Sequence, residues 1–303
     1  MIGAGDDRRI VPPPTDPMAV ARAFLADAYS SPDGIYLLRF HRNTFHRYAG
    51  DHWPEDDDHR VSSELWQWLE GAHYLKKSEP PELVPFEPTK YKIANVVDAL
   101  KAIGYVSQAA QPPMWLRRSA TTPIGAGEIV PVANGILDFA TRELRPHTPE
   151  LFFGHLLPFA FHPRAPRPVR WLRFLDELWY GDEESKATLG EWFGYVLSSA
   201  TNLQKMFLLV GPKRSGKGTI ARVLTGLLGT HNTAAPTLAS MTQNFGLQPL
   251  IGKPLAVISD ARLGTRADNM VAVERLLSIS GEDMLTVIAS TGSRGPAGCR
   301  HGS

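Results

Sequence analysis

The sequence has little cysteine, no long apolar run and almost no net charge. Its one cysteine, Cys299, excludes an internal disulfide and a cysteine-rich zinc site. Because no apolar run approaches the ~20 residues that a membrane-spanning helix needs, we expect a soluble, cytoplasmic protein with no membrane partner. Lys plus Arg number 32 against 31 for Asp plus Glu, so the overall charge does not indicate a polyanionic partner.

What remains is an ordinary globular composition, unevenly charged along the chain. With 43% hydrophobic residues in 303, the chain has enough apolar material for about two domain cores. Residues 1–200 carry a net charge of −5 and residues 201–303 a net charge of +6. The C-terminal third is therefore the basic part, as expected of a segment that handles phosphates or nucleic acid, although so small a shift also arises by chance.

Changes of composition divide the chain into five predicted segments. Residues 1–16 are charged and rich in proline, which is typical of a disordered leader, and 17–128 form an α+β region of unknown role. Residues 129–200 are expected to form a helical domain and 201–287 an α/β core. The remaining 288–303 lack apolar periodicity and indicate a low-complexity tail.

Apolar spacing predicts the elements within these segments. Apolar residues recur every three or four positions where a helix is expected and every second position where a strand is expected. Gly181-Asp182 divides one of the helical patterns into two. Helices are expected over 18–29, 62–74, 89–103 and, in two parts, 171–199; an antiparallel meander over 35–53; short strands around 130–137; and buried parallel strands over 205–210 and 254–260.

One motif carries chemistry. Residues 211–219 read GPKRSGKGT, a G-x-x-x-x-G-K motif between an apolar run and a helical pattern, which is the arrangement of a phosphate-binding loop. Glycines let backbone N–H groups turn toward a phosphate, the helix N-terminus adds partial positive charge, and Lys217 can reach the β- and γ-phosphates. The alternative is a Gly-rich surface turn. The predicted nucleotide-binding residues are Gly211, Pro212, Lys213, Arg214, Ser215, Gly216, Lys217, Gly218 and Thr219.

A magnesium site is predicted beside this loop. The position after the lysine usually holds a Ser or Thr that binds Mg²⁺, but here it is Gly218, so Thr219 is the candidate. Asp260 ends the apolar run 254–260, where a carboxylate would hold hydrated Mg²⁺. The alternative is an Asp that caps a turn. Lys217 and Asp260 are the predicted catalytic residues.

These stretches resemble superfamily 3 helicases of the phage and plasmid primase-helicase type. Three segments are similar to the Walker A, Walker B and B-prime motifs, and three upstream segments are similar to the helical domain that precedes the motor in that family. The resemblance covers about 130–287 and extends more loosely to 35. Its segments are 211–219, 244–261 and 276–283 in the motor, and 132–138, 145–149 and 191–195 upstream.

The resemblance implies an ATP-binding DNA helicase, an ATP hydrolase of phage or plasmid replication. The implied fold is an AAA-like α/β P-loop NTPase, preceded by a mainly helical α+β N-terminal region. The implied cofactors are ATP and Mg²⁺, and the implied partners are single-stranded DNA and further copies of the chain in a hexameric ring.

The sequence departs from that family after Val287. The sensor Asn and the arginine finger expected there cannot be found, and Ile288 begins the low-complexity tail. A frameshift that truncates the motor would explain this. Because such a finger is worth about 10³ to 10⁵ in rate, we expect nucleotide binding with little hydrolysis or unwinding by this chain alone.

Two other functions fit the loop. A nucleoside monophosphate kinase has a similar SGKGT sequence, although it carries the loop near its N-terminus and has an Arg-rich lid that is not visible here. A non-catalytic ATP-binding remnant is the second alternative. Whether the chain is an enzyme is therefore left open.

Three further clusters are interpreted as structural. Five histidines between residues 41 and 73 match no zinc spacing and are expected to be solvated or half-buried. The acidic run 55–58 is expected to be a solvated loop. Arginines and aromatics interleave over 39–53, which suits either a nucleic-acid surface or the packing of a small sheet.

Overall fold

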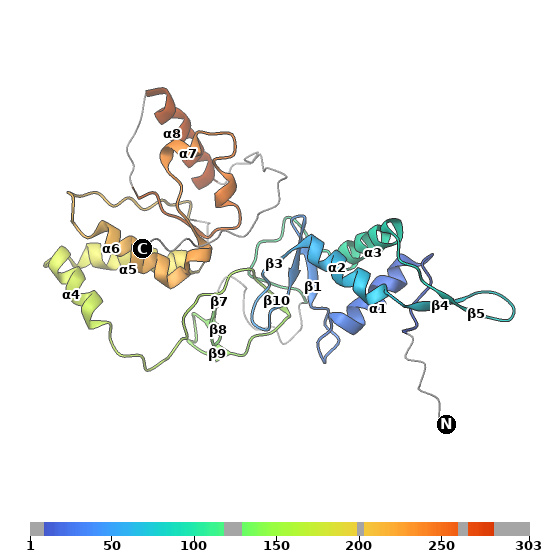
Figure 1. Ribbon diagram of the computed structural model, residues 1–303. Coiled ribbons are helices and arrows are strands. Elements are labelled where there is room, and N and C mark those ends of the chain that lie inside the picture. Colours follow the sequence, from blue (N-terminus) through green and yellow to red (C-terminus); the bar gives the residue numbers. More distant parts are fainter. Residues whose placement is uncertain (1–8, 118–128, 199–202, 260–265, 282–303) are drawn as a thin grey trace, which may run out of the picture. The chain divides into compact units, whose positions relative to one another are not determined.

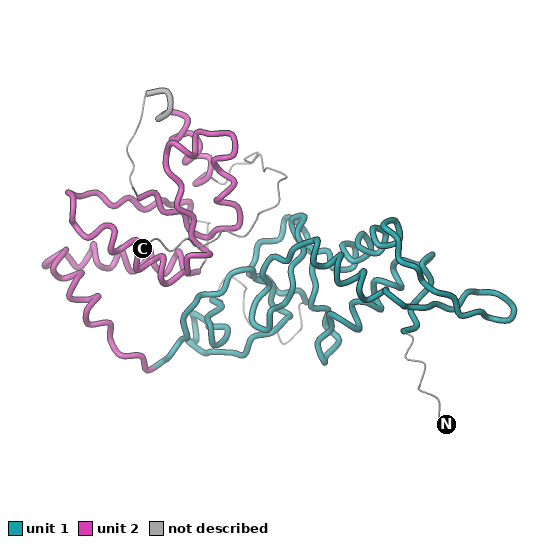
Figure 2. The backbone as a smooth tube through the Cα atoms, viewed as in Figure 1, with its two compact units in different colours: residues 1–163 teal, residues 164–303 magenta. Residues whose placement is uncertain are grey.

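The computed structural model describes residues 9–117, 129–198, 203–259 and 266–281. The chain separates into two compact units, unit 1 over residues 1–163 and unit 2 over residues 164–303 (Figures 1 and 2). Within the described ranges there are eight α-helices and only small sheets of two or three strands. None of the helices found there is long and apolar enough to cross a membrane.

Three helices build the core of unit 1. They are α1 (Pro17–Ala28), α2 (Asp58–Leu69) and α3 (Lys90–Ile103), and they confirm the three helices expected in this region, with α2 beginning and ending earlier than predicted. The side chains of Asp16, Asp57 and Thr89 cap their N-termini by accepting backbone N–H bonds. α3 packs against α1 and α2, and the buried side chains between them include Phe24, Leu65, Leu69, Val96 and Leu100.

The expected meander is present as three antiparallel strands. These are β1 (Leu38–His41), β2 (Thr44–Arg47) and β3 (Glu55–Asp56), in the order β1-β2-β3. Arg42 and Asn43 link β1 and β2 with positive φ values of 49° and 62°, the backbone that a two-residue hairpin turn requires.

The acidic run 55–58 is largely solvated, as its charge predicts, but it is not a loop. Glu55 and Asp56 form β3, Asp57 caps α2, and Asp58 is the first residue of that helix. Asp56 pairs with Arg47 at 2.7 Å, so an ion pair made across the sheet holds this one residue of the run in the fold.

The other strands of unit 1 are short. The expected strands around 130–137 are confirmed as a hairpin, whereas the helical domain predicted over 129–200 begins with strands, and its helices start only at Val169 in unit 2. The strands pair as β4 with β5, β6 with β10, and β7-β8-β9. Their bounds are β4 (His73–Lys76), β5 (Glu82–Pro85), β6 (Met114–Trp115), β7 (Ile129–Val132), β8 (Gly135–Asp138), β9 (Leu144–Arg145) and β10 (Leu151–Phe152).

Unit 2 contains the two helices predicted over 171–199 and the predicted phosphate-loop helix. α4 (Val169–Leu178) and α5 (Glu183–Leu197) are joined at Gly181, and Asp182 caps α5 through the backbone N–H of Ser185. α5 packs against α6 (Lys217–Leu228). Beyond α6 lie the short helices η2 (Thr230–Asn232), α7 (Leu238–Met241) and η3 (Gln248–Leu250), the strands β11 (Thr233–Ala234) and β12 (Leu255–Ala256), and α8 (Arg266–Ser280).

The predicted parallel sheet of an α/β core is only partly present. Residues 205–210 are not a strand, since they pair with no other described segment. Alternate side chains of this run pack inward at Phe207 and Leu209, whereas Leu208 and Val210 are 77% and 85% exposed. The run 254–260 contributes only β12, which pairs in parallel with β11. A buried parallel strand needs neighbours on both edges, and the described part of unit 2 supplies none for 205–210.

Two of the histidines in unit 1 are buried, not solvated or half-buried. His41 and His46 are 3% and 8% exposed, and both rings lie edge-on to Phe152. Nδ1 of His46 lies 3.1 Å from the carbonyl oxygen of Trp53, whereas Nε2 of His41 has no hydrogen-bond partner. Burial lowers the pKa of both rings below the ordinary value, because it penalises the charged form.

We expect the thermal midpoint of unit 1 to fall as the pH drops below about 6.5, the ordinary pKa of histidine. Since folding depresses the pKa of His41 and His46, the unfolded chain binds more protons in this window, so the stability present above it is lost as the pH falls. His46→Asn keeps a donor for the Trp53 carbonyl and should flatten the pH dependence measured by circular dichroism. His59→Asn, on the exposed start of α2, should leave the pH dependence of the thermal midpoint unchanged. Equal pH dependence in the wild type and both variants would contradict the role given to His46.

Candidate phosphate-binding site

The loop 211–216 turns the chain into α6 through left-handed backbone. Arg214 and Gly216 have φ values of 64° and 79°, and α6 begins at Lys217. No side chain caps the N-terminus of α6. The partial positive charge of the helix end is therefore left for a ligand, which is the arrangement that binds anions.

The Lys217 ammonium lies inside this loop. Nζ donates to the carbonyl oxygens of Gly211 and Pro212 at 2.8 and 2.7 Å and lies 3.0 Å from Oγ of Ser215. These contacts fold the loop around the ammonium, so the positive charge is held at its centre before any ligand arrives. A phosphate oxygen is a stronger acceptor than a carbonyl and can replace one of these partners.

Two glycines of the motif have side-chain atoms close to where a Cβ would lie. A Cβ on Gly211 would lie 2.8 Å from Oγ of Ser215, and one on Gly216 would lie 2.8 Å from Cζ of Phe174 and 2.9 Å from Cδ1 of Leu178. Gly216 also has the positive φ that side chains rarely adopt. A Cβ on Gly218 would meet only Arg222, at an ordinary 3.6 Å.

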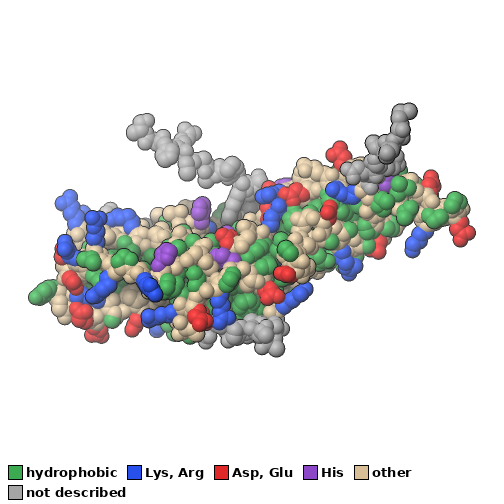
Figure 3. Space-filling view, turned by 90° about the horizontal axis from the view of Figure 1, so that it is seen from below, with side chains coloured by type: hydrophobic (Ala, Val, Ile, Leu, Met, Phe, Trp, Pro, Cys, Tyr) green, Lys and Arg blue, Asp and Glu red, His purple; other side chains and the backbone are tan. Residues whose placement is uncertain are grey.

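Four basic residues lie in the loop and on the first turns of α6. Lys213, Arg214, Lys217 and Arg222 form no ion pair with any carboxylate in the described part of the chain. Figure 3 shows Lys and Arg side chains interspersed with Asp and Glu on the part of unit 2 that faces the viewer, at the left. Arg222 donates to the hydroxyl oxygen of Thr219 at 3.1 Å, which fixes that hydroxyl on the first turn of α6.

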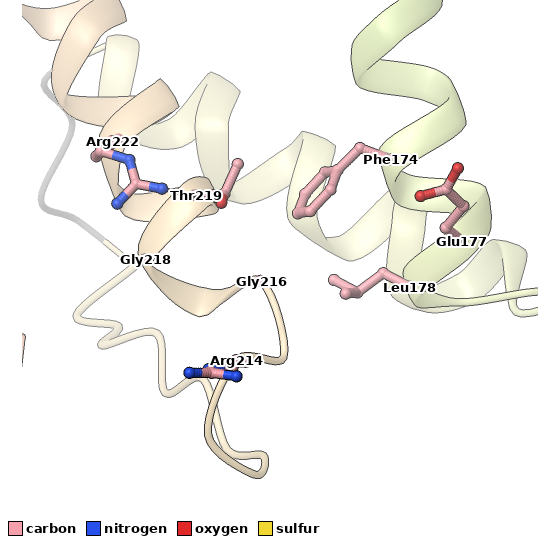
Figure 4. Close-up of a pocket in the computed structure, with 8 residues that line it drawn as sticks. All are labelled: Phe174, Glu177, Leu178, Arg214, Gly216, Gly218, Thr219 and Arg222. Atoms are coloured by element: carbon pink, nitrogen blue, oxygen red, sulfur yellow. Dashed lines mark hydrogen bonds between the residues drawn. The ribbon is translucent and has the colours of Figure 1, made fainter.

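A cavity of about 480 Å³ opens beside the loop (Figure 4). One wall comes from the loop and the first turns of α6, and the other comes from α4. Its volume lies in the range of small-molecule sites. The lining residues are Phe174, Glu177, Leu178, Arg214, Gly216, Gly218, Thr219 and Arg222.

The predicted site residues from Gly211 to Thr219 lie together around the start of α6. Asp260 lies outside the described residues, as does the tail 288–303, so their predicted roles stay predictions. Of the segment likened to B-prime, residues 276–280 end α8. No group of three His, Cys, Asp or Glu residues suited to a metal occurs among the residues that the structure describes.

Sequence reasoning missed the wall from α4 and the residue Arg222. The apolar spacing over 171–199 predicts helices but not what their apolar faces contact, and Phe174 and Leu178 both pack with Trp171 and Phe193 and line the cavity. The signal available was the position of Arg222, one helical turn beyond Thr219, which places both on the same face of α6.

We expect Gly216→Ala to loosen the start of α6, because it combines a strained φ with overlap of Phe174 and Leu178. The free energy of opening of α6 should fall by about 1–3 kcal/mol. Hydrogen–deuterium exchange measured by mass spectrometry would show this as faster exchange of the α6 amides. Gly226→Ala is the matched control, since it lies in the same helix with nothing within 4 Å of an added Cβ. Gly226→Ala should instead stabilise α6 by up to about 1 kcal/mol and so slow its amide exchange. Similar effects of both changes would contradict the role of Gly216.

The chain matches two family models and is similar to an uncharacterized curated protein. Residues 209–292, which include the loop, match a family of unknown function (DUF5906). A relative from Marchantia polymorpha, "Uncharacterized mitochondrial protein ymf21", is 26% identical over 129 residues, which is 39% of this chain and 72% of that protein. Residues 23–180 match the model described as D5 N terminal like. This match covers more than half of the chain and begins upstream of the segments that carry the resemblance. The chain therefore belongs to the D5 N terminal like family, which relates it to the primase-helicases of phages and plasmids.

Proposed function

We propose that unit 2 is an ATP-binding module of a DNA replication protein of the primase-helicase type, with the triphosphate held by the loop 211–219. The observation that carries this proposal is the Lys217 ammonium, centred in a loop of left-handed backbone at the uncapped start of α6. The family membership supports the replication context.

The charges of the site suit a triphosphate. Arg214 and Arg222 line the cavity and the Lys217 ammonium lies inside the loop, so three cations are available to a ligand that carries about four negative charges near neutral pH, and the helix N-terminus adds to the attraction. A monophosphate or a carboxylate would leave most of these cations unused. The cavity volume of about 480 Å³ also leaves room beyond the phosphates for the rest of a nucleotide.

Thr219 and Asp260 are the proposed magnesium ligands. The Thr219 hydroxyl lines the cavity at the start of α6, and hydroxyl and carboxylate oxygens are the donors that Mg²⁺ prefers. The ion would neutralise charge on the β- and γ-phosphates. Among the described residues, Thr219 is the member of this pair that can be placed.

Single-stranded DNA is the proposed polymer partner, as for a helicase that assembles as a ring. The arginines and aromatics that interleave over 39–53 in unit 1 do not support DNA binding. Arg47 pairs with Asp56 and Glu64 and lies over Tyr29, and Arg39 lies over Trp53, so these side chains are engaged within the fold. The support comes from the family and from the basic C-terminal third.

We expect Lys217→Ala to weaken binding of magnesium-ATP by roughly 10- to 150-fold, the value of a charge-assisted hydrogen bond to phosphate. Titration calorimetry on the full chain measures this. Lys205→Ala, which removes an exposed lysine from the run before the loop, should bind as the wild type does. Because the attraction is electrostatic, wild-type affinity should also fall as salt is added. Absence of ATP binding by folded wild-type chain would overturn the proposal.

Phosphate release tests the reaction class. With magnesium-ATP, we expect slow hydrolysis that single-stranded DNA stimulates severalfold and that Lys217→Ala abolishes. ADP formation that depends on added AMP would instead indicate a phosphotransferase, and binding without either reaction would indicate a non-catalytic module. A coupled assay with ATP alone, with DNA and with AMP separates the three outcomes.

A further inference from the structure

The cavity beside the phosphate loop has two chemically different ends. Arg214 and Arg222 come from the loop and from α6, whereas Phe174, Glu177 and Leu178 come from α4 (Figure 4). Cations therefore line one side, and an aromatic ring, an aliphatic side chain and a carboxylate line the other.

This asymmetry orients a nucleotide. Phosphates bind at the cationic side and are repelled from the Glu177 carboxylate, so the uncharged nucleoside must lie toward α4. A base gains little from charged groups but stacks on an aromatic ring and packs against aliphatic side chains. Phe174 and Leu178 are half-buried and supply these surfaces next to Gly216.

Phe174 is held in place before a ligand binds. Its ring stacks on Trp171 with the centroids 5.4 Å apart and the planes 28° apart, and Trp171 stacks in turn on Phe193 of α5 at 5.8 Å. The close approach of Phe174 to Gly216 fixes the ring relative to the loop. A ring positioned in this way costs little to order on binding.

We propose that the end of α4 is the nucleoside wall of the ATP site, with Phe174 and Leu178 in contact with the base. This inference rests on the proposed function, and it adds a role that the phosphate-loop motif does not contain. It also assigns a function to α4, which lies within the D5 N terminal like match at 23–180, while the loop lies within the second match at 209–292.

The test compares two magnesium-bound ligands, ATP and inorganic tripolyphosphate, on the full chain. Both present a triphosphate to the loop, but only ATP has a nucleoside. Phe174→Ala should weaken ATP binding by about 10-fold, since loss of one base–aromatic contact has this effect. It should leave tripolyphosphate binding within about twofold of the wild type.

Two variants control for folding and for general loss of an aromatic residue. Phe174→Leu keeps an apolar side chain in the cluster and should also weaken ATP alone, although less than Phe174→Ala does. Tyr180→Ala removes an aromatic side chain that is 95% exposed, just beyond α4 and outside the cavity, and should change neither ligand. Circular dichroism confirms that each variant is folded.

The outcomes separate the two proposals. Equal weakening of both ligands by Phe174→Ala and Phe174→Leu would show that the ring only supports the loop and would overturn the nucleoside wall. Unchanged ATP affinity in both variants would overturn it as well. Failure of the wild-type chain to bind either ligand would overturn the phosphate site itself. Tripolyphosphate binding as tight as ATP binding would leave the phosphate site intact and overturn the nucleoside wall.

Discussion

The candidate site depends on the backbone of Gly216. Its positive φ lets the chain enter α6 directly from the loop, so that the helix begins without a side-chain cap and Lys217 turns back into the loop. The missing Cβ also lets Phe174 and Leu178 of α4 approach the loop. One residue thus satisfies a conformational requirement and a packing requirement, and it joins the loop to the helix that faces it. Without it, the cation cluster and the apolar wall would not share one cavity.

The features predicted correctly from the sequence are those that short stretches determine. The helices of unit 1 follow from apolar spacing, since their buried side chains recur every three or four residues. The residues of the motif lie together around the start of α6 because they are consecutive in the chain. Each of these predictions required only interactions between neighbours in the chain.

The features that were wrong or missed depend on distant partners. The apolar run 205–210 has the composition of a buried strand, yet composition does not say whether another strand will pair with it, and in the described structure none does. Asp56, in the acidic run 55–58, is held in the sheet by its ion pair with Arg47. Burial of His46 accompanies that of Trp53, whose indole N–H donates to the carbonyl of Leu151, 98 residues away. No local pattern carries that information.

The apolar pattern of α4 likewise predicts a helix without indicating that part of the helix borders the site. Only part of the apolar face of α4 is covered by neighbouring helices. Leu175 is buried among them, whereas Phe174 and Leu178 remain partly exposed at the cavity. A sequence pattern records that a face is apolar but not which part of it another helix covers.

If α4 and the loop bind the two ends of one nucleotide, as we propose, then neither matched region is a complete site. Any ligand that contacts both walls stabilises the packed arrangement over the separated one, because it binds only the former tightly. Nucleotide affinity and the docking of α4 against α6 are then two measures of one equilibrium. The helix that the D5 N terminal like region contributes would therefore sense the nucleotide, which offers a physical reason for this region to precede a phosphate-binding loop in the same chain.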